Sequence, residues 1–135
     1  MISTEKRSSS RKNKILLVEH SSDMRKALAL RLKELGHEVF EAETSLDAFR
    51  QARSISPDLI LIDLGMLVGG DELMRWLKTD LLTRHIPIIV ATPLLLGPAV
   101  DRAVAAGAAD VIQKPFDFDA LSTTLQRHLP VTSVV

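Results

Sequence analysis

Three polar residues stand at the ends of short apolar runs, where together they could hold a phosphoryl group. Asp63 follows Leu59–Ile62, Thr92 follows Ile88–Ala91, and Lys114 ends a third such run. Runs of this kind are typical of parallel strands buried on both faces. Open α/β sheets place their chemistry at the carboxyl ends of such strands. An acid, a hydroxyl and an ammonium at neighbouring strand ends therefore indicate a site for phosphoryl chemistry.

The first apolar run, Ile15–Val18, is followed by Glu19 and His20. A carboxylate at position 20 would complete an oxygen-rich metal site with Glu19 and Asp63, but imidazole suits softer metals than Mg²⁺. His20 has three interpretations, which we rank in this order. When protonated it replaces the metal by pairing with Asp63 or Glu19; it is a loop residue without a role; or it binds a transition metal together with both carboxylates.

The elements that must position these residues alternate along the chain. Strands are predicted at 15–18, 38–42, 59–63, 88–91 and 109–113. Helices between them are indicated by apolar residues at helical spacing, namely Met24, Leu28, Leu32 and Leu35; Leu46, Phe49 and Ala52; Leu73, Met74 and Leu77; Val100 and Val104; Leu121 and Leu125. This order predicts an α/β fold, a (βα)5 doubly wound, five-stranded parallel sheet of flavodoxin-like architecture in one domain.

Local signals mark where several of these helices begin and end. Thr44 or Ser45 can cap the second helix and Asp117 the last one. Gly36 and Gly107 follow the first and fourth helices, as C′ glycines do. Gly69-Gly70 opens the third helix.

Composition limits the class of protein. The chain has 135 residues, a charged fraction of 25% and no cysteine, which fits one soluble domain without disulfides or thiolate metal sites. No apolar stretch approaches the roughly 20 residues of a membrane helix, and no secretory signal precedes the first strand. We therefore expect no membrane association and a cytoplasmic location.

Charge is unevenly distributed although the chain is neutral overall. Residues 1–14 hold five basic residues against one acidic residue, so the remainder is net acidic. We expect residues 1–13 to form a disordered basic tail, residues 14–130 the domain, and residues 131–135 a short C-terminal tail. A solubilising leader is favoured over an arm for an acidic partner, because no aromatic residue interleaves the charges.

Taken in order, the motifs resemble the receiver domain of bacterial two-component response regulators. The resemblance covers about residues 14–129 and rests on segments 15–19, 57–64, 87–92, 105–110 and 114–117. It implies that Asp63 accepts a phosphoryl group from a histidine kinase or phosphotransfer protein. Thr92 would turn toward that group, and Lys114, ahead of a cis Lys114-Pro115 peptide, would pair with it. Glu19, Asp63 and the carbonyl of Gly65 would hold Mg²⁺.

Three departures from the family pattern modify this expectation. His20 replaces the second metal-binding acid, so Mg²⁺ binding should be weakened or absent. The loop after Asp63 lacks the usual proline and is one residue shorter. Val111 stands where many receivers have an aromatic ring that reports the switch.

A partner surface is also expected. Leu94, Leu95 and Leu96 either fold back on the core or form an exposed patch, and we favour the patch. Receivers commonly dock partners on the fourth helix and fifth strand. The chain stops just past the last helix, so we expect a stand-alone receiver without a DNA-binding domain that signals by protein–protein contact.

Other functions remain open at this stage. A pseudo-receiver would have the same fold but dock its partner without phosphorylation, which His20 and Val111 favour. A haloacid-dehalogenase-type phosphohydrolase also starts from an aspartate at a strand end, but Gly65 occupies the place of its second acid. A flavin binder would need a phosphate loop after the first strand, and none is seen. We therefore expect a signalling protein and not an enzyme.

Overall fold

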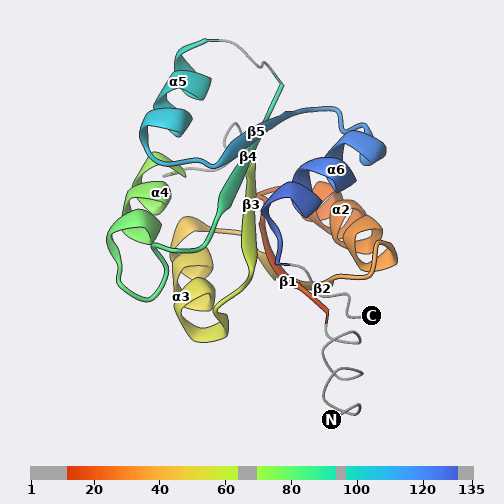
Figure 1. The fold of residues 1–135 in the computed structure, drawn as a ribbon, viewed down its shortest axis with the longest axis horizontal. Coiled ribbons are helices and arrows are strands. Elements are labelled where there is room, and N and C mark those ends of the chain that lie inside the picture. The colour runs from red at the N-terminus through yellow and green to blue at the C-terminus, as the bar shows by residue number, and fades with distance from the viewer. Residues whose placement is uncertain (1–11, 64–69, 94–96, 131–135) are drawn as a thin grey trace.

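The computed structural model describes residues 12–63, 70–93 and 97–130 (Figure 1). Within these ranges five strands alternate with five helices. The strands are β1 (Lys14–Val18), β2 (Glu38–Ala42), β3 (Leu59–Asp63), β4 (Ile88–Thr92) and β5 (Asp110–Gln113). The helices are α2 (Ser22–Glu34), α3 (Ser45–Ile55), α4 (Gly70–Thr79), α5 (Pro98–Ala105) and α6 (Phe118–His128).

All strand pairs are parallel, and the strand order is β2-β1-β3-β4-β5. The order reverses between β1 and β3, and this is the point where open α/β sheets place their sites. β1, β3 and β4 are apolar and buried along nearly their whole length, as strands covered on both faces must be. The predicted (βα)5 doubly wound fold is confirmed.

The helices form two layers, α3, α4 and α5 on one face of the sheet and α2 and α6 on the other (Figure 1). Alternate strand residues supply the two cores. Leu16, Ile60 and Ile88 face the first layer, and Ile15, Leu61 and Ile89 face the second. No described helix is long and apolar enough to cross a bilayer.

Several predicted helix boundaries are confirmed. Thr44 caps α3 by accepting a hydrogen bond from the backbone of Asp47, and Asp117 caps α6 in the same way. Gly36 and Gly107 follow α2 and α5 with positive φ angles of 98° and 108°. The remaining signal, Gly69-Gly70, is half described, and Gly70 begins α4.

Four of the apolar residues whose helical spacing indicated the helices are exposed. Met24 and Leu35 are 47% and 42% exposed because they lie in the first turn and at the C-cap of α2, where the apolar stripe ends. Leu46 is 50% exposed at the start of α3. Val104 is 57% exposed because α5 turns Ala103, its neighbour, toward the sheet.

The two ends of the described chain are tied together. Asn13 is 6% exposed and donates a hydrogen bond from its side chain to the carbonyl of Pro130 at 3.3 Å. Its own carbonyl accepts from the backbone of Glu38 at 2.9 Å. Asn13 is thus integrated into the fold at the amino end of the sheet.

Gly107 supports a prediction about stability. An added Cβ would lie 3.1 Å from Cγ of Lys78, in a backbone conformation that side chains disfavour. Gly36 has a similar φ angle but open space around it. We expect Gly107→Ala to lower the free energy of unfolding by about 1–2 kcal/mol, and more than Gly36→Ala. Urea unfolding followed by Trp76 fluorescence measures both, and equal losses would contradict the proposed contact with Lys78.

Candidate functional site

Four candidate residues lie at the carboxyl edge of the sheet. Glu19 follows β1, Asp63 ends β3, Thr92 ends β4, and Lys114 follows β5. Because the strands are parallel and in register, these positions meet at one edge. Glu19, Asp63 and Thr92 are only 3%, 4% and 7% exposed. The sheet therefore gathers two carboxylates, a hydroxyl residue and an ammonium in a nearly dry site.

Lys114 neutralises part of this negative charge. Its ammonium forms an ion pair with Oδ2 of Asp63 and lies 4.0 Å from Oε1 of Glu19. The Lys114 side chain is 17% exposed, so the pair is shielded from most of the solvent. Ionising both carboxylates would leave one negative charge uncompensated by this lysine. Such a site attracts a further cation or a proton.

Glu19 shows this imbalance in its pKa. Burial raises the pKa of Glu19, and the neighbouring Asp63 raises it further. The backbone N–H of Ser21, 2.9 Å from Oε2, and the Lys114 ammonium lower it, but the net direction is upward. The pocket therefore stabilises the ionised Glu19 carboxylate less well than water does, unless a further cation binds beside it.

Neighbouring residues fix the position of Glu19. Its backbone N–H donates to Ala42 at 3.0 Å, and its carbonyl accepts from Nη1 of Arg25 at 2.9 Å. Nε of Arg25 in turn donates to Glu41 at 3.2 Å, and the Arg25 side chain is only 12% exposed. Helix α2 and strand β2 together hold the segment after β1.

One oxygen of the site has no protein partner among the described residues. Oδ1 of Asp63 is buried and accepts no hydrogen bond there, although its companion Oδ2 is paired with Lys114. An unpaired buried acceptor costs free energy, roughly 1–3 kcal/mol. A ligand or cation that reaches Oδ1 would recover that cost.

The backbone on the far side of the site is also ordered. The N–H of Lys114 donates to the carbonyl of Thr92 at 2.8 Å, which extends the pairing of Thr92 with Gln113. The Lys114-Pro115 peptide is cis, as the resemblance implied. Val111 is half-buried on β5.

His20 differs in placement from the four clustered residues. It is exposed, and Lys114 is the cation that the described residues bring to Asp63 and Glu19. Across residues 12–63, 70–93 and 97–130, no group of three His, Cys, Asp or Glu side chains could hold a metal ion. Gly65 and the Leu94–Leu96 loop lie outside the described residues.

Sequence reasoning overlooked Ser21 and Arg25. Ser21 could have been found, because a serine ahead of Met24 is an N-cap signal for α2. Arg25 could not, because its role depends on the distance between α2 and β2, and no local pattern encodes that distance.

Comparisons with known proteins agree with this geometry. The chain is 30% identical over 116 residues to the polar-differentiation response regulator DivK of Brucella ovis, covering 85% of this chain and 94% of that protein. The solved chemotaxis protein CheY4 of Vibrio cholerae is 28% identical with a TM-score of 0.82, over 88% of this chain and 100% of that one.

A third match carries a metal. The receiver domain of a sensor histidine kinase from Pseudomonas aeruginosa is 28% identical, with a TM-score of 0.80, over 87% of this chain and 98% of that one. That structure is described with a magnesium ion coordinated in its active site cleft. Residues 15–126 match the family profile of the response regulator receiver domain. The chain therefore belongs to the response regulator receiver domains of two-component signalling systems.

Proposed function

We propose that this receiver domain accepts a phosphoryl group on Asp63 from a histidine kinase or a phosphotransfer protein. A carboxylate oxygen of Asp63 would attack the phosphorus of a phosphohistidine. The new P–O bond forms as the P–N bond breaks, and its electron pair leaves with the imidazole. The observation that supports this role most directly is the buried Asp63, paired with Lys114 on one oxygen and unpartnered among described residues on the other.

The neighbouring residues fit supporting roles. Lys114 would balance charge on the transferred oxygens, because its ammonium is already held beside Asp63. Thr92 would offer its hydroxyl to the phosphoryl group from the end of the adjacent strand. Glu19 would balance an incoming cation, since its carboxylate is buried next to Asp63.

Mg²⁺ would be held by Glu19, Asp63 and the carbonyl of Gly65. Such an ion supplies charge neutralisation to the phosphoryl oxygens during transfer. The unpartnered Oδ1 of Asp63 and the raised pKa of Glu19 fit a hard cation. His20 contributes no carboxylate, so we propose weaker Mg²⁺ binding than in receivers with an acid at this position.

The output would be protein–protein contact. We propose that a downstream partner docks on α5, β5 and the Leu94–Leu96 loop, where Val104 is exposed. The domain would begin at the buried Asn13, one residue before the expected 14–130, with a basic tail ahead of it and a short tail of residues 131–135, in the cytoplasm. The phosphoacceptor role makes this a signalling module rather than an enzyme.

A second candidate is a docking module that is never phosphorylated. His20 and Val111 favour it, because they replace a metal ligand and the ring that reports the switch in many receivers. Both candidates share the fold and the partner surface, so phosphorylation itself distinguishes them.

Phosphorylation of Asp63 can be tested directly on the purified protein. We expect purified protein treated with phosphoramidate or acetyl phosphate, with Mg²⁺ or Mn²⁺, to gain one phosphoryl group by intact mass. Asp63→Asn should abolish the adduct, while Asp101→Asn, which alters an exposed carboxylate on α5, should leave it unchanged. Absence of an adduct with either metal would favour the docking module.

Restoring the family acid should strengthen metal binding. We expect His20→Asp to increase Mg²⁺ affinity at least about tenfold, since a carboxylate near a divalent cation contributes well over 1.4 kcal/mol. Isothermal titration calorimetry measures this, with the exposed His85→Asp as the matched control. Equal affinities in all three proteins would mean that position 20 does not reach the metal.

Replacing Lys114 should lower the stability of the protein, because Asp63 and Glu19 would then have no cation beside them among the described residues. We expect Lys114→Met to destabilise the protein by about 2 kcal/mol or more at pH 8, because two buried carboxylates lose their cation. The loss should shrink as the pH falls and Glu19, whose pKa is raised, takes up a proton. Urea unfolding at several pH values tests this against the exposed Lys26→Met, and a pH-independent loss would refute the charge explanation.

A further inference from the structure

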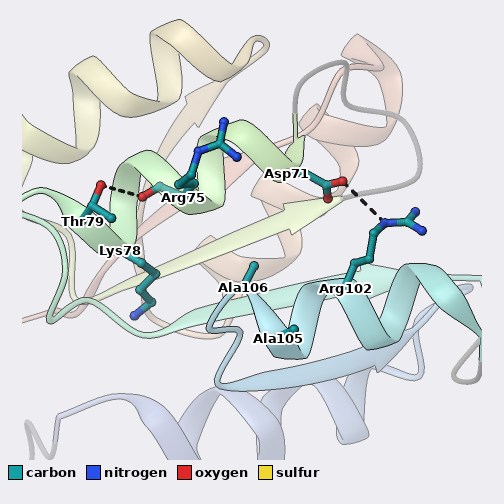
Figure 2. A pocket seen from close by; sticks show the side chains of 7 residues that line it. All are labelled: Asp71, Arg75, Lys78, Thr79, Arg102, Ala105 and Ala106. Atoms are coloured by element: carbon teal, nitrogen blue, oxygen red, sulfur yellow. Dashed lines mark hydrogen bonds and ion pairs between the residues drawn. The ribbon is translucent and has the colours of Figure 1, made fainter.

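A groove of about 440 Å³ runs between α4 and α5, apart from the phosphoacceptor site (Figure 2). Asp71, Arg75, Lys78 and Thr79 line one wall at helical spacing along α4. These side chains lie outside the buried face of α4, which carries the apolar residues Leu73, Met74 and Leu77. This wall therefore combines the apolar stems of long side chains with charged ends.

The opposite wall explains why the groove exists. Ala105, the last residue of α5, and its C-cap Ala106 line this wall with only a methyl group each, too small to fill the space between the helices (Figure 2). The Thr79 hydroxyl donates to the carbonyl of Arg75 at 2.8 Å, so it does not reach across. Small residues on one wall leave room for the close approach of another backbone.

Cations outnumber anions around this groove. Arg102 of α5 pairs with Asp71 at 3.5 Å, but both side chains are about 60% exposed, with values of 61% and 59%. Exposed ion pairs of this kind contribute little to stability. Arg75 is exposed and has no ion-pair partner among the described residues.

Lys78 adds a third positive charge at the other end of the groove. Its ammonium donates to the carbonyls of Arg84 and Ile86 at 3.2 and 3.1 Å. Carbonyls satisfy its hydrogen bonds but do not neutralise its charge. Burial lowers the pKa of Lys78 from its ordinary value of 10.5, which is the direction expected for a cation without a nearby acid. The groove thus carries a positive rim over an apolar floor.

We propose that this groove binds a helix of a partner protein that presents acidic side chains beside small apolar ones. Carboxylates would pair with Arg75 and Arg102, and the apolar residues would pack on Ala105 and Ala106. A groove between two helices accepts a third helix by its apolar stripe. A nucleotide fits less well, because the described residues that line the groove include no aromatic side chain to stack on a base.

Each helix that forms the groove follows, along the chain, a strand that ends in a candidate site residue. Helix α4 follows β3, which ends at Asp63, and α5 follows β4, which ends at Thr92. Binding of an acidic helix in this groove requires no phosphoryl group on Asp63. Its test therefore uses unmodified protein, so its failure leaves the proposed phosphoacceptor role untouched.

Disulfide tethering offers a direct test, because the chain contains no cysteine. Ala105→Cys places one thiol in the groove, and Ala27→Cys places one on an exposed position of α2 as a control. Each protein is equilibrated with three amidated cysteine peptides under increasing reductant. The first is an alanine-based helix with glutamates at helical spacing, the second has glutamine in their place, and the third is the first with a central proline.

At Cys-substituted position 105, we expect the disulfide with the glutamate peptide to withstand about fivefold more reductant than the disulfide with the glutamine peptide, read by intact mass. At position 27, neither peptide should be preferred. Adding Arg75→Gln and Arg102→Gln should abolish the preference. Equal capture at both positions, or a preference that survives loss of both arginines, would overturn the proposal. Equal capture of the proline peptide would overturn the helical part, and spontaneous disulfide dimers of the Ala105→Cys protein would indicate a second copy as occupant.

Discussion

The site depends on one unequal balance of charge, two buried carboxylates beside one ammonium. Asp63 and Glu19 are held almost free of solvent at the ends of β3 and β1, and Lys114 from the end of β5 is their counter-ion. The cluster requires three strands in parallel register, so the sheet topology and the site chemistry are not separable. The remaining negative charge favours binding of a further cation or a proton in the pocket.

Helix α2 contributes to this balance without supplying a charge to the pocket. Arg25 donates a hydrogen bond to the carbonyl of Glu19 and pairs with Glu41 on β2. Ser21 caps the helix, and its backbone N–H donates to the Glu19 carboxylate. Glu19 is thereby held by backbone and side-chain contacts on both sides. The exposed His20 next to it makes no such contact among the described residues.

Most of the fold could be predicted because its signals are local. Apolar runs in β3 and β4 and the caps Thr44 and Asp117 act within a few residues, and each specified its element correctly. Exposed Met24 and Val104 show the limit, since helical spacing gives the angle of a side chain but not whether a neighbour covers it. The candidate site residues were recognisable from strand ends. The contacts of Arg25 with Glu19 and Glu41, and the groove between α4 and α5, depend on distances between elements, which no local pattern records.

The hydrogen bond between Asn13 and Pro130 has a practical consequence for the architecture. It brings the entry to β1 and the exit from α6 together at the amino end of the sheet, whereas Asp63 lies at the carboxyl end of β3. Anything joined to the domain at residue 12 or residue 130 therefore starts from one common point, away from the end of the sheet that carries Asp63. Both connections of the domain therefore lie at one end of the sheet, and the candidate site lies at the other.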